Sequence, residues 1–464
     1  MSARGAKSIA VVGGGITGLT AARALHQAGF AVTVFERNPR IGGAIATTEK
    51  DGWLIESGPN SLQQTAEISS LIAELHLENQ LITTAPTAKK RFVVRGGKLI
   101  PVPLSPPELL SSPLFSLGAR ARVFTELLTR PRVRTTDTSL ASFIGAHFGR
   151  EVVDYGLNPL VAGIYAGDPD KLSARHAFPR LWQLERTHGS LLRGFRAEAQ
   201  ARRARDEKAG ATPIISFTRG LQVLPDSLAA SLPSGVVRTE TAVTAIIPGR
   251  PWKIISSGGG SVATDEFDAI VLALPASGLA QLTFSTLGER PLASLENQPH
   301  PPVSTLFLGF KREQVAHPLD GFGALVPALE RRNLLGVLFS SSLFAGRAPD
   351  GHVALTVFAG GTRQPETGRL STDALTGRVM PDLRELLGIT GDPVFTHHTF
   401  WPKAIPQYNV GHERFLEPMA RCEIDHPGLF IGGNARDGIS VPDCIKSGRA
   451  LAAKVSAFLD ARKV

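Results

Sequence analysis

Three glycines near the start of the chain have the spacing of a nucleotide-binding turn. They are Gly13, Gly15 and Gly18, and they directly follow the apolar run of residues 9–12. The first glycine permits a tight turn, the second lets a pyrophosphate approach the backbone, and the third allows a helix to pack closely on a strand. The N-terminus of that helix then faces the phosphates. Glu36 ends a second apolar run, where a carboxylate can accept both ribose hydroxyls; the alternative is a solvated charge at a strand end.

A basic loop rich in glycine extends this pattern. Arg37 and Arg40 precede Gly42 and Gly43, an arrangement that suits a second pass of the backbone over a pyrophosphate and that nicotinamide sites lack. The glycine turn, the Glu36–Arg37 pair and this loop resemble the glutathione-reductase-like FAD domains, particularly those of the amine oxidase superfamily. FAD is therefore expected rather than NAD. The cofactor contacts implied for these two loops are Gly13, Gly14, Gly15, Ile16, Thr17, Gly18, Glu36, Arg37, Gly42, Gly43 and Ala44.

Residues 52–61 resemble the segment that this superfamily lays along the flavin. Gly58 and Pro59 would let the backbone approach the ring, and Asn60 could form a hydrogen bond near its reactive edge. The alternative for Asn60 is a turn residue that caps the next helix.

Three longer strings narrow the resemblance to the FAD-containing, oxygen-dependent porphyrinogen oxidases. They are NPLVAGIYAGDP at 158–169, WPKAIPQY at 401–408 and DGISVPDCI at 437–445, and the match runs nearly the full length of the chain. The resemblance implies a six-electron oxidation of protoporphyrinogen IX to protoporphyrin IX, with hydride passing to FAD and dioxygen reduced to hydrogen peroxide. The alternatives are oxidation of coproporphyrinogen III, another flavin amine oxidase or desaturase reaction, and a flavin-binding protein without catalytic activity.

A tetrapyrrole that carries propionates needs a large apolar slot with a positive group at its mouth. The resemblance assigns the propionate partner to Arg91, for which a solvated arginine in a basic stretch is the alternative. It assigns an aliphatic clamp around a pyrrole ring to Leu325 and Leu338 and a stacking aromatic to Phe358, each of which could instead be sheet core. Gly163 corresponds to a glycine whose carbonyl orients or polarises the substrate; its alternative is a turn glycine.

The same resemblance completes the flavin site. It implies a backbone contact from Val243 to the adenine, packing of Trp401 near the isoalloxazine, and a loop that reaches the pyrophosphate and flavin. Gly163 and Asn60 are the residues expected beside the reacting atoms. Neither a protein nucleophile nor a metal site is expected, because the cofactor carries the difficult chemistry. The loop residues are Gly433, Asn434, Ile439 and Val441.

An α/β fold must position these residues. A strand at 9–12, a helix that ends near Gly29 and a strand at 31–35 make a βαβ unit and begin a parallel sheet. Arg-rich segments interrupted by prolines later in the chain predict a mostly helical insertion. Further apolar runs predict a second sheet that forms one side of the substrate site. The expected division is a Rossmann-like FAD-binding domain of residues 1–90, 206–290 and 401–464, a helical region of 91–205 that binds substrate and faces a membrane, and a substrate-binding sheet domain of 291–400.

Composition limits the setting. The 464 residues include only two cysteines, which fits a reducing compartment, and the formal charge of +9 suits an acidic substrate or anionic lipid. The chain has no nucleic-acid motif, and no leader is expected, so a cytoplasmic protein is predicted. A peripheral contact with the inner face of the cell membrane is a further expectation, because apolar residues at 109–117 adjoin five arginines; the alternative is a helical core with a solvated basic face. A homodimer is expected from the family alone. The arginines are Arg120, Arg122, Arg130, Arg132 and Arg134.

Overall fold

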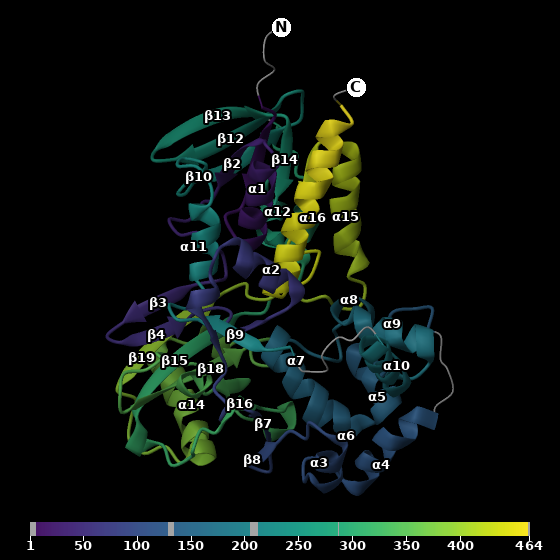
Figure 1. Ribbon diagram of the computed structural model, residues 1–464, viewed down its shortest axis with the longest axis vertical. Helices are drawn as coiled ribbons and strands as arrows, with labels where there is room; N and C mark the ends of the chain where they lie inside the picture. The colour runs from purple at the N-terminus through teal and green to yellow at the C-terminus, as the bar shows by residue number, and fades with distance from the viewer. Residues whose placement is uncertain (1–5, 129–133, 205–211, 286, 463–464) are drawn as a thin grey trace.

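The computed structural model describes residues 6–128, 134–204, 212–285 and 287–462. A parallel sheet forms the upper part of the molecule in Figure 1. Its outer strands are short, and its central strand is apolar and buried from Ile9 to Val12, as expected for a strand covered on both faces. The strand–turn–helix–strand order expected for residues 9–35 is present. The strands are, in order, β10 (Val237–Arg238), β2 (Ala31–Phe35), β1 (Ser8–Val12), β14 (Ala269–Leu272) and β20 (Leu429–Ile431).

Different elements cover the two faces of this sheet because successive strand residues point in opposite directions. Ile9 and Val11 pack against α1 (Ile16–Gln27) and α16 (Val441–Asp460). The opposite face packs against a small antiparallel sheet and two helices. Those elements are β11 (Ala242–Ile247), β12 (Trp252–Gly258), β13 (Ser261–Phe267), α12 (Ala276–Gln281) and α15 (Glu413–Asp425).

Smaller elements join the parallel sheet to the lower part of the molecule. A hairpin and a three-stranded sheet lie between the two parts, and two helices pack beside α1 and α16. These elements are β3 (Thr47–Lys50), β4 (Trp53–Glu56), β5 (Leu62–Gln63), β6 (Leu81–Thr83), β9 (Ile214–Phe217), α2 (Ala66–Glu74) and α11 (Val223–Ala230).

A mixed sheet of seven strands forms the lower left of Figure 1. One of its faces packs its alternate apolar residues against α14 (Thr372–Leu387), which leaves the other face for the site described below. The short helix α13 (Ser340–Leu343) follows β17. The strands are, in order, β19 (Phe395–Trp401), β15 (Val303–Lys311), β18 (His352–Gly360), β17 (Gly336–Leu338), β16 (Gly321–Leu325), β7 (Lys90–Arg95) and β8 (Lys98–Pro101).

The start of the expected helical region differs from the structure. Residues 91–101 were expected in that region, but they form β7 and β8 of the seven-stranded sheet. β7 pairs in parallel with β16, whereas its own hairpin partner β8 is antiparallel. The strand β7 was not predicted because basic residues occupy both of its ends and only Phe92, Val93 and Val94 in its middle are buried.

The helical region forms the lower right of Figure 1, and α7 lies between its other helices and the seven-stranded sheet. In the part of the chain that the structure describes, no helix is long and apolar enough to cross a bilayer. Arg130 and Arg132, which were expected to face a membrane, lie outside the described residues. The helices are α3 (Pro106–Ser111), α4 (Leu117–Thr125), α5 (Leu140–Phe148), α6 (Arg150–Val152), α7 (Asn158–Tyr165), α8 (Ala174–Ala177), α9 (Pro179–His188) and α10 (Leu191–Ala204).

Candidate active site

The glycine turn between β1 and α1 has the close packing that its spacing predicts. Gly13 has a φ of +111° and donates its N–H to the carbonyl of Phe35 at 2.8 Å. A Cβ on Gly18 would overlap the carbonyl oxygen of Gly13, so α1 could not lie this close to β1 with any other residue there. Ile16 and Thr17 open the helix and are buried. The helix therefore begins directly behind the turn, with its free N–H groups at the turn.

Glu36 lies at the edge of this turn, at the end of β2. Its carboxylate accepts the N–H groups of Gly14 and Asn38, both at 2.9 Å, and is largely buried. The N–H of Thr241 donates to the Glu36 carbonyl at 2.9 Å, which brings the strand that carries Val243 to the same place. The predicted ribose and adenine contacts are thus adjacent.

The second glycine loop closes over the first. Gly42 donates its N–H to the carbonyl of Gly14 at 2.8 Å, and Arg40 holds the loop by donating to the Gly43 carbonyl at 2.7 Å. A Cβ on Gly43 would lie 3.4 Å from the Cα of Gly15, so side chains at these positions would fill the space between the loops. Arg37 is exposed beside them. This glycine cradle at a helix N-terminus fits a pyrophosphate.

A third loop, which follows β20, reaches the start of α1. Gly433 donates its N–H to the hydroxyl of Ser447 at 2.9 Å, and a Cβ on Gly433 would lie 3.5 Å from the hydroxyl of Thr17. The Tyr408 hydroxyl donates to the carbonyl of Asn434 at 2.6 Å and accepts the N–H of Gly438 at 3.0 Å, which fixes the loop.

The remaining residues of the third loop connect it to both neighbouring parts of the protein. Ile439 packs against the apolar cluster of the helical region, and Val441 begins α16 in the same cluster as Ile16. Two loops from the start of the chain and one from its far end therefore meet at one helix N-terminus, as the predicted set of cofactor contacts requires.

The segment before β5 approaches the second loop closely. Trp401 donates its indole N–H to the carbonyl of Ser57 at 2.9 Å, and a Cβ on Gly58 would overlap the carbonyl oxygen of Ala44. Pro59 is half-buried, and Asn60 donates its side-chain amide to the Gly58 carbonyl at 2.9 Å. The helix-capping alternative for Asn60 is wrong, because the side chain that caps the next helix, α2, is Thr65.

The four residues expected at the substrate lie on one face of the seven-stranded sheet. Phe358 on β18 and Leu325 on β16 both pair with Gly336 of β17, so their side chains point to the same side. Leu338 lies two residues beyond Gly336 and shares that side. On β7, Arg91 lies two residues before the pairing partner of Leu325, which places it on this face as well.

The expected residues on this face are less buried than their neighbours on the opposite face. Leu325, Leu338 and Phe358 are half-buried, but Val337 and Val357 beside them are fully buried against α14. The contrast favours a lined wall over sheet core for the three residues. Arg91 is exposed at the end of the row, with its guanidinium 5.6 Å from the centre of the Phe322 ring.

Helix α7 lies against this wall and narrows the space in front of it. A Cβ on Gly163 would lie 2.5 Å from the Cδ2 of Leu325, and a Cβ on Gly336 would lie 3.3 Å from the same atom. Leu325 is therefore held between two glycines. Leu160 and Ile164, which flank Gly163 on α7, are exposed apolar residues. The wall and the helix together place apolar side chains opposite one another with Arg91 at one end, which is the arrangement expected for a substrate slot.

A buried acid–base pair lies next to Asn60. Glu56 is 3% exposed and Arg347 is 2% exposed, with 3.9 Å between a carboxylate oxygen and a guanidinium nitrogen. The carboxylate accepts the hydroxyl of Thr47 at 2.7 Å and the N–H of Leu221 at 2.8 Å. These two hydrogen bonds and Arg347 do not offset burial, which raises the pKa of Glu56 to about 7. Asn60 and this pair line a cavity of about 10 Å³.

The raised pKa predicts how Glu56 affects stability. Because the folded pKa of about 7 lies above the ordinary 4.5, stability from this group is complete below pH 4.5 and is lost as the pH rises to 7. The Glu56→Gln protein has no group to ionise at this position. We therefore expect the difference in free energy of unfolding, Glu56→Gln minus parent, to rise by about 3 kcal/mol between pH 4.5 and pH 7. Urea unfolding of both proteins at several pH values measures it. A difference that does not change with pH would contradict the raised pKa.

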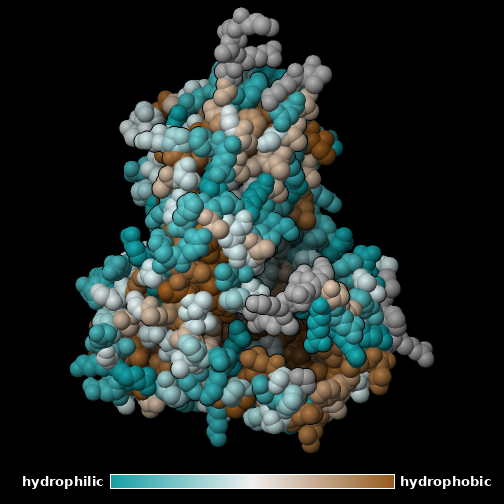
Figure 2. Space-filling model, in the orientation of Figure 1, coloured by the Kyte–Doolittle hydropathy of each residue, from teal (hydrophilic) through white to brown (hydrophobic). Residues whose placement is uncertain are grey.

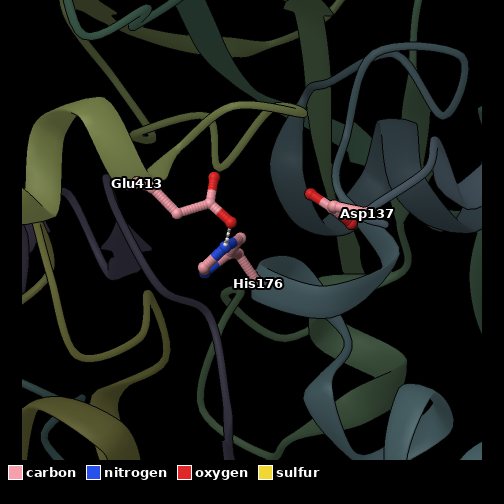
Figure 3. Close-up of side chains that lie close together, drawn as sticks. All are labelled: Asp137, His176 and Glu413. Carbon is pink, nitrogen blue, oxygen red and sulfur yellow. Dashed lines mark hydrogen bonds and ion pairs between the residues drawn. The ribbon is translucent and has the colours of Figure 1, made fainter. Parts of the chain in front are cut away.

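Sequence reasoning missed one cluster of ligand-type side chains, shown in Figure 3. Asp137, His176 and Glu413 bring one ligand atom each within 4.8 Å of one another. His176 Nε2 lies 2.7 Å from a Glu413 oxygen, and Arg175 lies 3.6 Å from the same oxygen. Asp137 accepts the N–H of Thr138 at 2.8 Å. Because Glu413 already has the Arg175 guanidinium and the His176 ring as partners, the cluster acts as a polar contact between the helical region and α15.

The fold and the three loops that converge at the start of α1 are those of a flavin-dependent oxidoreductase. The family described as flavin containing amine oxidoreductase matches residues 16–456, and the chain belongs to this family. It is an FAD-dependent oxidase. Bound FAD supplies a two-electron acceptor, and the chain supplies the cradle and the slot.

The similar proteins include two curated relatives and one solved structure. Protoporphyrinogen oxidase 2, chloroplastic/mitochondrial, of Arabidopsis thaliana is 34% identical over 482 residues, covering 98% of this chain and 94% of the relative. Coproporphyrinogen III oxidase of Bacillus subtilis (strain 168) is 29% identical over 473 residues, covering 98% and 99%. A crystal structure from Exiguobacterium sp. 255-15, with a provisional protoporphyrinogen oxidase designation, has a TM-score of 0.82 at 25% identity, covering 98% of this chain and 99% of that one.

Proposed function

We propose that this protein oxidises protoporphyrinogen IX to protoporphyrin IX, removing six electrons in three rounds. Bound FAD would supply the hydride acceptor for each round, and dioxygen would take up the electrons and leave as hydrogen peroxide. Porphyrinogen oxidases among the relatives, at 34% and 29% identity over nearly the whole chain, support the substrate class. The observation that carries the proposal is that Arg91, Leu325, Leu338 and Phe358 lie on one face of the sheet, partly exposed, with Gly163 of α7 against Leu325.

In this proposal each residue has a separate task. Arg91 pairs with a propionate at the mouth of the slot, and Leu325 and Leu338 hold a pyrrole ring by apolar contact. Phe358 stacks on the macrocycle. Gly163 allows α7 to approach the substrate, and its carbonyl orients a pyrrole N–H. The chain therefore contributes position and charge pairing rather than a dedicated base.

A second candidate substrate is coproporphyrinogen III, which carries propionates where protoporphyrinogen IX has vinyl groups. The Bacillus relative named for this activity supports it. One exposed arginine at the end of an otherwise apolar wall favours the substrate with fewer carboxylates, because each further propionate would need its own partner. The mainly aliphatic wall also argues against an amine site built as an aromatic cage.

The test is turnover of the two porphyrinogens in parallel. The purified yellow protein receives protoporphyrinogen IX or coproporphyrinogen III under air, and porphyrin fluorescence reports the product. Faster oxidation of protoporphyrinogen IX supports the proposal. A clear preference for coproporphyrinogen III would instead identify the second candidate as the substrate. If neither is oxidised by protein that retains its flavin, porphyrinogen oxidation is wrong.

Replacement of Arg91 by alanine gives a sharper test of the slot. A propionate remote from the reacting carbon is bound equally in the ground state and the transition state, so its loss raises KM and spares kcat. We expect Arg91→Ala to raise KM roughly tenfold, as for the loss of one charge-assisted hydrogen bond, and to change kcat by less than about twofold. Lys89→Ala, an exposed cation two residues away, is the matched control. An unchanged KM in Arg91→Ala would remove Arg91 from the site.

The setting of this activity is part of the proposal. We place the enzyme in the cytoplasm, with a peripheral contact between its helical region and anionic lipid, and as a homodimer. Apolar side chains exposed around α3 and α4 support the lipid contact, together with Arg120 and Arg122 on α4. Figure 2 shows brown surface over this lower part of the molecule. The exposed side chains are Leu104, Leu110, Leu117 and Leu128.

A further inference from the structure

Arg363 connects helix α7 to the wall of the slot. It lies three residues beyond the end of β18 and is half-buried. Its Nη1 donates to the carbonyl of Val326 at 2.8 Å, and its Nη2 donates to the side-chain oxygen of Asn158 at 3.0 Å. Val326 directly follows Leu325 in the wall, and Asn158 is the first residue of α7. One guanidinium therefore spans both sides of the slot.

Asn158 is held from a second direction as well. Its side-chain oxygen also accepts the backbone N–H of Ala328 at 2.9 Å, so both donors to this oxygen belong to the sheet side of the slot. Burial lowers the pKa of Arg363 to about 10, which leaves the group charged at neutral pH, and Asp168 acts in the opposite direction. The contact to Asn158 is thus a charge-assisted hydrogen bond, the stronger class of such bonds.

The residue before Arg363 holds the other end of the same helix. Thr362 donates its N–H to the carbonyl of Ala166 at 2.8 Å, and Ala166 ends α7 with a φ of +48°. The side chain of Gln407 donates to the carbonyl of Tyr165 at 2.8 Å. Two consecutive residues of one loop therefore fix the two ends of an eight-residue helix.

Gly163 lies between these two fixed ends. A Cβ there would lie 2.5 Å from Leu325, so a small displacement of α7 changes the space that Leu325 leaves for a substrate. We propose that Arg363 is a positioning residue: through Asn158 and Val326 it sets the distance between α7 and the wall, and so it selects porphyrinogens by the width of their substituents. This inference rests on the proposed function and adds a residue that does not touch the substrate.

The geometry requires an arginine at this position. A guanidinium presents several N–H groups in a planar fork, which lets it reach a backbone carbonyl and an amide oxygen at once. The ammonium of a lysine is a compact point charge without that fork, and a glutamine has a single NH₂ group. We therefore expect the Arg363→Lys protein to retain only part of the substrate affinity that the Arg363→Gln protein loses.

The test compares Arg363→Gln, Arg363→Lys and Asn158→Ala with the control Arg369→Gln. Arg369 belongs to the same connection after β18, but its side chain is 50% exposed and pairs only weakly with Glu366 at 3.9 Å. All are studied as flavin-loaded proteins. We measure KM and kcat for protoporphyrinogen IX and coproporphyrinogen III, and, independently of turnover, the affinity for the product protoporphyrin IX by fluorescence titration. Flavin absorbance and unfolding midpoints report on the fold.

We expect Arg363→Gln to raise KM for protoporphyrinogen IX and Kd for protoporphyrin IX, each on the order of tenfold, because α7 and the wall are no longer held at the separation that fits the macrocycle. The preference for protoporphyrinogen IX over coproporphyrinogen III should narrow at least about threefold, because a wider slot rejects bulky substituents less well. Asn158→Ala should shift these quantities in the same direction, and Arg369→Gln should match the parent protein.

Three results would overturn the inference. They are an Arg363→Gln protein with parental KM, Kd and preference, a loss of activity that is equal for both substrates while Kd is unchanged, and an Asn158→Ala protein with parental values. The last result decides the matter even if Arg363→Gln fails to fold. A parent protein that oxidises neither porphyrinogen would instead contradict the proposed function.

Discussion

Gly18→Ala is expected to give a protein without bound flavin. The added Cβ would overlap the carbonyl oxygen of Gly13, a backbone atom in a turn that is itself fixed by the hydrogen bond from Gly13 to Phe35. The helix must therefore move away from β1, which removes its N–H groups from the pyrophosphate. We expect the free energy of unfolding to fall by about 3 kcal/mol from overpacking alone, and further through loss of the ligand. The ratio of flavin to protein absorbance measures the result.

Gly377→Ala is the control for this substitution. Gly377 lies inside α14, and a Cβ there would meet no atom within 4 Å among the described residues. Alanine should raise stability by roughly 0.5–1 kcal/mol, because it favours a helix more than glycine does. Full flavin content in Gly18→Ala would show that the close approach of α1 to β1 is not required for binding.

Gly163→Ala is expected to spare the fold and the flavin but to impair the substrate slot. The new Cβ would lie 2.5 Å from Cδ2 of Leu325, and this atom is the end of a side chain that can rotate. A Cβ at Gly336 would lie 3.3 Å from the same atom, so Leu325 has little room on that side and must turn into the slot. We expect kcat/KM to fall on the order of 100-fold, the usual effect of a misplacement of about 1 Å.

The double variant with Leu325→Ala separates this cause from others. If the clash with Leu325 is responsible, Gly163→Ala should cost much less in kcat/KM when residue 325 is already alanine. The two effects would then be strongly non-additive. Losses that simply multiply in the double variant would show that the alanine acts in another way, for example by moving the Gly163 carbonyl.

The glycine turn and the carboxylate of the flavin half could be predicted because their signals are local, whereas Val243, Trp401 and the loop after β20 came from the family resemblance. The spacing of Gly13, Gly15 and Gly18 and the position of Glu36 after a second apolar run prescribe a turn, a helix and a carboxylate within one βαβ unit. The structure places them accordingly, with Gly14 donating to Glu36. Each of these contacts joins residues that are close in sequence, so short-range physics is enough to predict them.

The substrate half could not be predicted in the same way. Arg91 and Leu325 reach one face only through the parallel pairing of β7 with β16, which joins segments more than two hundred residues apart. Hydrophobic periodicity does not identify the partner of a strand, so these residues depended on a family resemblance. The contact of Arg363 with Asn158 gave no sequence signal, because Asn158 begins the string at 158–169 but nothing in the sequence links it to Arg363.

The pairing of α1 with α16 also has a consequence for biosynthesis. The cofactor cradle opens at Ile16, but the helix that packs beside it begins at Val441 and carries the third loop at its start. At a translation rate of 5–20 residues per second, roughly 20 to 90 s separate the emergence of these two segments from the ribosome. Throughout that interval the first βαβ unit has its glycine turn but lacks the third loop, which follows β20. We therefore expect the cofactor to be captured only after α16 has been made, so that cells short of flavin accumulate full-length apoprotein, as the ratio of flavin to protein in the purified protein would show.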